Sequence, residues 1–127
     1  MNPAEKILPD WFTVKEDGTF GWSQYHNRQS GWDAIRCPLY AYWYNSNHPW
    51  VNLWKAWYEK YGNDVSRLPA RVDIATSGVA DAMYSTYTGF KAVFNLVKND
   101  KATTNISEVS YYLDSLEFLC WLALNHY

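Results

Sequence analysis

The stretch GWDAIRCPLYAYW, residues 31–43, decides how the first part of the chain folds. Its apolar side chains recur at helical spacing and predict a helix over about residues 32–45. The positions that share this face are Ala34, Ile35, Leu39, Tyr42 and Trp43. Ser30 stands where an N-cap is expected, and Pro38 is tolerated near the first turn, where its missing N–H matters least.

Asp33 and Arg36 lie three positions apart at the start of this expected helix. In one interpretation they are structural. A carboxylate near a helix N-terminus is favoured by about 0.3–1 kcal/mol, and Arg36 adds a local ion pair worth a few tenths. In the other interpretation they are functional, because an ionised carboxylate in a cleft walled by Trp32 and nearby tyrosines can activate water as a general base. Spacing alone leaves both interpretations open.

A hairpin is expected before this stretch and a second helix after it. Asp17-Gly18 lies between two short aromatic runs, a pattern typical of a β-hairpin. Asn47 as cap and Pro49 in the first turn begin a helix over about residues 49–61, which Gly62 ends. Its apolar stripe, which we expect to be mostly core, consists of Trp50, Leu53, Trp54, Trp57, Tyr58 and Tyr61.

The remaining sequence predicts two further helices. Residues 63–78 contain Pro and Gly and are expected to form a long connection, followed by helices over about 79–98 and 106–125. Loops of about 15 residues are uncommon in compact helical proteins and are often functional. The sequence therefore predicts an all-α fold of helical hairpins with long loops and one short β-hairpin, in a single domain over residues 1–127.

Charge and cysteine content exclude several classes of protein. The net charge is -2, so there is no basic footprint for nucleic acid or an anionic membrane. No apolar run reaches the roughly 18 residues of a membrane span, and the charged N-terminus MNPAEKILPDW lacks the apolar core of a signal peptide. Cys37 and Cys120 lie far apart and are expected to be buried free thiols rather than a disulfide or a zinc site. The histidines show no metal-ligand spacing, so no metal is expected.

Aromatic residues are unusually frequent. The chain has 8 Trp, 11 Tyr and 5 Phe, more than a core of this size needs. Trp and Tyr serve as anchors between proteins because they combine a large rigid area with a polar tip. They also serve as platforms on which sugar rings stack. Composition does not choose between these two uses.

Four segments in order carry a resemblance to a known family. They read PDW (9–11), GWDAIRCPLYAYW (31–43), PARVDIATSG (69–78) and YYLDSLEFL (111–119). Together they resemble the C-terminal portion of glycoside hydrolase family 8, the bacterial endoglucanases and cellulases. The D-A-x-R-x-P element is the most specific of the four.

The resemblance implies part of an (α/α)6 barrel and inverting hydrolysis of β-1,4-glucans, with no cofactor. It implies an extracellular or periplasmic location. In the family the aspartate of the D-A-x-R motif is the general base and its arginine holds the base in place, which implies these roles for Asp33 and Arg36. The aromatic residue before the base lines the cleft and corresponds to Trp32.

Further sugar contacts are expected from four residues. The family's C-terminal motif implies Tyr111 and Tyr112, although one of these two should be core because neighbours on a helix point about 100° apart. Tyr40 is expected to face the cleft rather than the core. Asp73 either lines the cleft or caps a turn.

The general acid of the family, a glutamate in its N-terminal part, has no counterpart in this sequence. Inversion needs two carboxyl groups, one to protonate the leaving oxygen and one to activate water. We expect the glutamates of this chain to be solvated surface charges; they are Glu5, Glu16, Glu59, Glu108 and Glu117. The isolated chain is therefore expected to be inactive, and to need either the missing N-terminal barrel portion or self-association to cover its apolar flanks. The alternative is a non-catalytic helical module that binds carbohydrate or protein.

Overall fold

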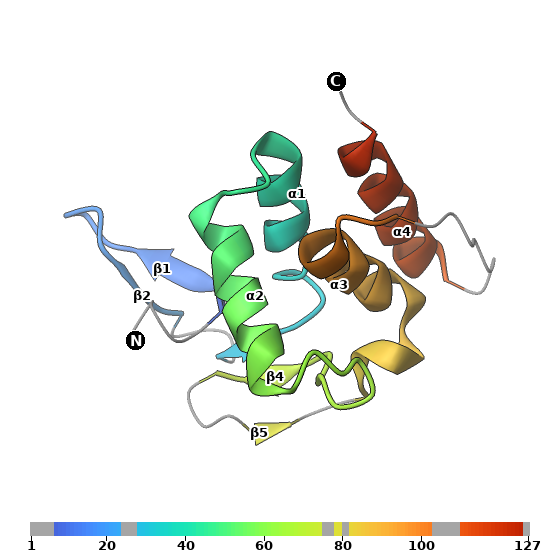
Figure 1. Ribbon diagram of the computed structural model, residues 1–127. Coiled ribbons are helices and arrows are strands. Elements are labelled where there is room, and N and C mark those ends of the chain that lie inside the picture. The colour runs from blue at the N-terminus through green and yellow to red at the C-terminus, as the bar shows by residue number, and fades with distance from the viewer. Residues whose placement is uncertain (1–6, 24–27, 75–77, 80–81, 103–109, 126–127) are drawn as a thin grey trace.

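The computed structural model describes residues 7–23, 28–74, 78–79, 82–102 and 110–125. Within these ranges the chain forms helices α1 (Arg36–Tyr44), α2 (Pro49–Lys60), α3 (Thr88–Asn99) and α4 (Tyr111–Leu124), with a short 3-10 helix at Tyr84–Thr86. Helix α3 lies at the centre and contacts each of the other three, and α4 packs along its side (Figure 1). The mainly helical prediction is confirmed.

The predicted hairpin is present. Strands β1 (Phe12–Val14) and β2 (Phe20–Trp22) pair antiparallel, and the chain reverses at Asp17 and Gly18. Gly18 has a φ of 84°, which glycine adopts without strain. The Asp17 carboxylate accepts hydrogen bonds from the Thr19 N–H and hydroxyl, at 2.9 and 2.6 Å, and fixes the turn.

A second small sheet was not predicted. Strands β3 (Gln29–Ser30), β4 (Val72–Asp73) and β5 (Gly78–Val79) pair antiparallel in that order. Strand β4 lies in residues 63–78, which we expected to form a long connection, and β5 spans the boundary between that connection and the helix predicted from residue 79. Each strand has only two residues, too few for the alternation of apolar and polar side chains that identifies a strand in a sequence.

Helix α1 begins later than predicted, at Arg36 instead of residue 32. Residues 32–35 form a tight turn, in which the N–H of Ile35 donates to the carbonyl of Gly31 at 3.0 Å. With this start, Pro38 occupies the first turn of the helix, which is where proline is tolerated. Ser30 lies in β3 and is not the N-cap, so that prediction was wrong.

Helix α2 has nearly the predicted bounds, but its cap is a different residue. The N–H of Trp50 donates to Nδ1 of His48 at 3.1 Å, so His48 takes the capping role expected of Asn47. Helix α4 is capped by Ser110, whose hydroxyl accepts from the N–H of Leu113 at 3.3 Å. The predicted start of this helix at residues 106–109 lies outside the described residues.

Helix α3 starts at Thr88 rather than residue 79. The segment before it is held by main-chain hydrogen bonds to a distant part of the chain: the N–H of Tyr84 donates to the carbonyl of Leu68 at 2.8 Å, and the N–H of Ala70 donates to the carbonyl of Ala82 at 2.9 Å. Backbone groups that are bonded across the fold cannot join a helix. The 3-10 helix then connects this segment to α3.

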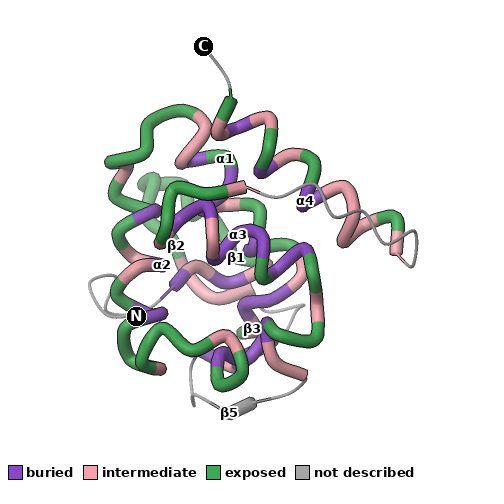
Figure 2. Tube along the Cα trace, turned by 45° about the vertical axis from the view of Figure 1, so that its right-hand side comes forward, coloured by how far each residue is buried: buried purple, intermediate pink, exposed green. Residues whose placement is uncertain are grey.

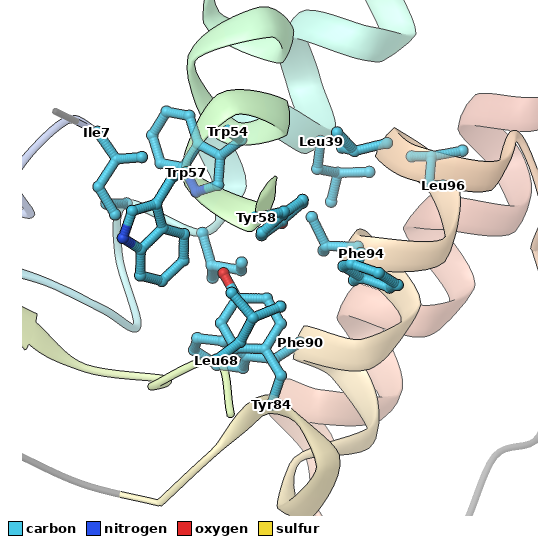
Figure 3. Close-up of a cluster of buried hydrophobic side chains, with 14 of the residues drawn as sticks. Ile7, Leu39, Trp54, Trp57, Tyr58, Leu68, Tyr84, Phe90, Phe94 and Leu96 are labelled. Atoms are coloured by element: carbon cyan, nitrogen blue, oxygen red, sulfur yellow. The ribbon is translucent and has the colours of Figure 1, made fainter. Parts of the chain in front are cut away.

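The core is rich in aromatic side chains from α2, α3 and the 3-10 helix (Figure 3). Trp54, Trp57 and Tyr58 of the predicted stripe are buried, whereas Trp50 at the start of α2 is 42% exposed. The rings of Tyr58 and Phe94 meet edge to face at 5.0 Å between centroids, a favourable arrangement of two aromatic rings. The expectation that this stripe is mostly core is confirmed.

Helices α3 and α4 approach closely at Gly89. A Cβ atom at this position would lie 2.8 Å from the carbonyl oxygen of Leu113 and 3.0 Å from the Cβ of Leu116. Glycine is therefore required for the observed distance between the two helices. Along most of α3 the chain is buried (Figure 2), which places this contact well inside the molecule.

Both cysteines are free thiols, as predicted, with Cys120 buried and Cys37 partly buried. Glu117 corrects a prediction, because it is only 3% exposed rather than a solvated surface charge. It lies on the face of α4 that carries the buried residues Leu116 and Cys120. Glu16 and Glu59 are exposed as expected, and Glu5 and Glu108 lie outside the described residues. In the described ranges we find no helix with both the length and the apolar character to cross a membrane.

Candidate active site

The turn between β3 and α1 presents Asp33 and Arg36 together. Nη2 of Arg36 lies 3.1 Å from Oδ1 of Asp33, and Nε of Arg36 donates to the Asp33 carbonyl at 3.3 Å. The guanidinium thus contacts both the carboxylate and the main chain of the same residue. The two side chains are 48% and 44% exposed, and an ion pair this open to water adds at most about 1 kcal/mol to stability. Its main consequence is the orientation of the Asp33 carboxylate.

Asp33 makes no capping hydrogen bond to α1, so the capping role that the structural interpretation gives it is not observed, whereas the local ion pair with Arg36 is present. The N-cap position of α1 is Ile35, which makes no side-chain capping bond. The turn is capped instead by Asp10, whose Oδ1 accepts from the N–H of Gly31 at 2.8 Å and from the N–H of Ala34 at 2.7 Å. Asp10 comes from the loop before β1, and no local sequence pattern connects it to a helix more than twenty residues away.

Burial raises the pKa of Asp10 above its usual value of 3.8. Main-chain hydrogen bonds from Ala34, Gly31 and Asp33 oppose this effect, and the nearby negative charge of Asp33 adds to it. The Asp10 and Asp33 carboxyl groups therefore interact electrostatically within one turn.

Trp32 packs inward from this turn against α3 and α4. Its ring lies 4.9 Å from that of Tyr87, 5.2 Å from that of Phe90 and 5.5 Å from that of Tyr112, measured between centroids. The Tyr112 hydroxyl donates a hydrogen bond to the main-chain carbonyl of Trp32. These contacts fix the residue that directly precedes Asp33. No pattern in the sequence indicated Tyr87 and Phe90 as partners of Trp32.

Tyr112 shares its environment with the charged groups of the turn. Burial raises the pKa of Tyr112 to about 12; the positive charge of Arg36 lowers it, while Asp33, Asp10 and Tyr40 raise it further. Of the two tyrosines predicted from the C-terminal motif, Tyr112 is therefore the one that the fold brings to the turn.

The other expected contact residues lie at different depths. Tyr111 is 91% exposed at the first position of α4, and Tyr40 is 50% exposed on α1, one turn after Arg36. Asp73 lies half-buried in β4, where it pairs with Gln29 of β3, four positions before Asp33. The fold thus brings Asp33, Arg36, Trp32 and Tyr112 together and places Tyr40 and Asp73 on neighbouring elements.

A separate hollow lies between the β-hairpin and the start of α2. Its volume is about 190 Å³, and its lining includes Phe12, Phe20, Trp22 and Trp50. The Arg28 guanidinium lies 5.0 Å from the centroid of the Trp22 ring, within reach of a cation–π interaction. In the described ranges, no cluster of three or more His, Cys, Asp or Glu side chains is placed to hold a metal ion.

Comparison with known proteins gives a consistent result. The model of the family described as Glycosyl hydrolases family 8 matches residues 1–126. An endoglucanase from Cellulomonas uda is 31% identical over 81 residues, which are 63% of this chain and 22% of that protein. The chain therefore spans about a fifth of the length of this curated relative.

Solved structures of the same family share the fold. A family 8 endo-β-1,4-glucanase from an Achatina fulica gut metagenomic library superposes with a TM-score of 0.82 and 29% identity, over 94% of this chain and 37% of that protein. A family 8 endoglucanase from Klebsiella pneumoniae gives a TM-score of 0.80 and 28% identity, over 93% of this chain and 37% of that protein. The expected correspondence to part of an (α/α)6 barrel is confirmed. Because the family model covers almost every residue, the chain belongs to glycosyl hydrolases family 8.

Proposed function

We propose that this chain supplies the general-base half of an inverting β-1,4-glucanase site. The observation that carries the proposal is the Asp33–Arg36 pair: a solvent-accessible carboxylate, oriented by an arginine, in a chain of family 8. Asp33 is the base, and Arg36 is the residue that fixes its carboxylate.

The geometry of the pair suits the activation of water. Arg36 contacts one carboxylate oxygen of Asp33, which leaves the second oxygen available to accept a proton from a water molecule. As that water attacks the anomeric carbon, its proton passes to Asp33 and the bond to the leaving sugar breaks. A second carboxyl group must protonate the leaving oxygen, about 6.5–9.5 Å from the base in inverting enzymes.

We infer that the general acid lies outside this chain. Among the described glutamates, Glu59 pairs with Lys98 at 3.2 Å, Glu117 is buried in α4, and Glu16 lies on the β-hairpin. We therefore assign the role of general acid to none of these three residues. The isolated chain should therefore be inactive, and its site should be completed by further barrel segments. The family 8 structures above, of which it spans 37%, contain such segments.

Sugar contacts complete the proposal. Trp32 is packed between α3 and α4 and can offer only part of its ring to a ligand. Tyr40 and Tyr111 are more exposed, so they have free ring faces on which a pyranose can stack. We assign substrate contacts to these three residues together with Tyr112 and Asp73, and the substrate class is a β-1,4-linked polysaccharide or oligosaccharide.

The test is hydrolysis of carboxymethyl cellulose, measured as new reducing ends. This chain is assayed alone and as a chimera in which it replaces the matching segment of the Achatina gut library endoglucanase. In the chimera, Asp33→Asn should reduce turnover by about 10²–10⁴-fold, the usual contribution of a general base, while cello-oligosaccharide binding is retained. Asp17→Asn, which changes an equally small exposed aspartate on the β-hairpin, should leave turnover unchanged.

Two results would reject the proposal. Turnover by Asp33→Asn equal to that of the unmodified chimera would remove Asp33 as the base. Hydrolysis by the chain alone would place an acid among the glutamates that we excluded.

A non-catalytic binding module is the second candidate. The hollow lined by Phe20, Trp22 and Trp50 favours it, because exposed aromatic rings bind sugars or apolar protein side chains. If Trp50→Ala abolishes cello-oligosaccharide binding by the chain while Asp33→Asn leaves the chimera active, the chain is a binding module.

A further inference from the structure

Five main-chain N–H groups of the turn at residues 31–37 have acceptors other than the Asp33 carboxylate, and among them that of Arg36 donates to the Asp33 carbonyl at 3.3 Å. Those of Gly31 and Ala34 donate to Asp10. That of Ile35 donates to the Gly31 carbonyl at 3.0 Å, and that of Cys37 donates to the Ala34 carbonyl at 2.9 Å. An aspartate at a helix start commonly turns its carboxylate onto such free N–H groups. Here Asp10 and the main chain occupy them, so the Asp33 carboxylate remains in contact with Arg36 and solvent.

We propose that Asp10 is a positioning residue for Asp33, which caps the turn from a distant loop and so keeps the catalytic carboxylate available. The inference rests on the proposed role of Asp33 as a base. Asp10 acts through its hydrogen bonds to the turn, and we assign it no contact with the substrate. Tyr112 supports the same turn from its other side through the Trp32 carbonyl.

Both hydrogen bonds of Asp10 end on a single oxygen, Oδ1. An asparagine retains a carbonyl oxygen at this position, so Asp10→Asn can keep both bonds while removing the charge. Asp10→Ala removes the bonds and the charge together. The two variants therefore separate the positioning effect of the hydrogen bonds from any effect of charge.

The electrostatics of the site predict a signature for the wild-type chain. Because burial raises the pKa of Asp10, the amide protons of Gly31 and Ala34 should change chemical shift with a midpoint above pH 3.8 as this carboxyl group titrates. The charge of Asp33 contributes to the raised value, so Asp33→Asn should lower the midpoint. This response tests the interaction of the two carboxyl groups, and the kcat values test the positioning role.

The experiment has two parts. Amide proton NMR spectra of this chain are recorded from pH 3 to pH 8 for the wild type, Asp10→Asn, Asp10→Ala and Asp33→Asn. Turnover of carboxymethyl cellulose is measured in the chimera. Asp10→Asn should keep kcat within a few-fold, whereas Asp10→Ala should lose about 10²-fold in kcat with KM little changed, the cost of a catalytic group misplaced by about 1 Å.

Asp64→Ala is the matched control. The Asp64 carboxylate also caps a turn, accepting from the N–H of Ser66 at 3.0 Å, and it lies after the end of α2. Its removal should leave kcat unchanged, which separates a general loss of a turn cap from the loss of this one.

The outcomes distinguish the inference from the proposed function. Equal kcat values for Asp10→Ala and Asp10→Asn would overturn the inference, as would amide signals of Gly31 and Ala34 that do not change with pH in the wild type. Full turnover by Asp33→Asn would overturn the proposed function and the inference with it. An inactive Asp33→Asn variant beside a fully active Asp10→Ala variant would overturn the inference alone. If Asp10→Ala fails to fold, Asp10→Ser, whose shorter side chain cannot hold both hydrogen bonds in place, replaces it in the kcat comparison with Asp10→Asn.

Discussion

Gly89→Ala should destabilise the protein because α4 lies too close to α3 for a Cβ atom. The added carbon would stand 2.8 Å from the Leu113 carbonyl oxygen and 3.0 Å from the Leu113 Cα and the Leu116 Cβ. Ordinary carbon contacts are about 3.5–4.0 Å, so α4 must move outward by about 0.5–1 Å. The nearest atoms belong to the backbone and cannot rotate away, which puts the cost near the upper end of the range for overpacking, about 3 kcal/mol.

Helix propensity partly offsets this cost. Alanine is favoured over glycine inside a helix by about 1 kcal/mol, which leaves a net loss of about 2 kcal/mol in the free energy of unfolding. For a chain of this length, that corresponds to a fall in Tm of about 6–10 °C. The assay is thermal unfolding followed by far-UV circular dichroism, with urea unfolding to give the free energy directly.

Gly21→Ala is the control for this substitution. Its Cβ would meet only the end of the Lys15 side chain, at 3.2 Å, and that side chain can move aside. Its effect should stay within about 0.5 kcal/mol. A Gly89→Ala variant with a Tm equal to or above that of the wild type would show that α3 and α4 are farther apart than described, and the close support of Trp32 by Tyr112 would then also be in doubt.

Two further properties of the chain can be measured directly. Burial raises the pKa of Cys37 to about 11 and that of Cys120 to about 12. At pH 8 both thiols of the folded protein should therefore react with Ellman's reagent about a hundredfold or more slower than a free cysteine, and they should react at the normal rate in denaturant. Fast reaction in the folded state would contradict their burial. The exposed side chains Phe118 and Trp121 of α4 should promote self-association. Light scattering at micromolar concentration should therefore give a mass above the 14.9 kDa of one chain, and Phe118→Ser should lower that mass. A monomeric wild-type protein would refute this prediction.

Local patterns in the sequence predicted the elements whose structure is decided locally. The β-hairpin was correct because Asp17 and Gly18 satisfy their turn with neighbouring residues. Helix α2 was correct because its apolar stripe coincides with the side that packs into the core. The Asp33–Arg36 contact was predicted because side chains three positions apart in a helical turn lie close together, although the turn that carries them is capped by the distant Asp10.

Elements decided by distant contacts could not be predicted in this way. The segment before α3 has helical periodicity, but its main chain bonds to Leu68 and Ala70 instead, and those residues precede it by more than ten positions. The start of α1 likewise depends on Asp10. In both cases a hydrogen bond between distant segments prevails over the helical preference of the local sequence. A local sequence pattern does not indicate which of the two prevails.

Stability alone does not explain why the turn at Asp33 contains two interacting carboxyl groups. The Asp33–Arg36 pair is open to water and adds little to stability. Ionisation of Asp10 weakens its contribution to stability: because its pKa is raised in the folded chain, the protonated carboxyl group favours folding below pH 3.8, and this extra contribution is lost as the pH rises through the folded value. A turn selected only for stability would replace this half-buried carboxylate with a neutral acceptor. Retention of two interacting carboxyl groups within one turn is the kind of local conflict that proteins keep where chemistry requires it. Such a conflict agrees with the role that we propose for Asp33.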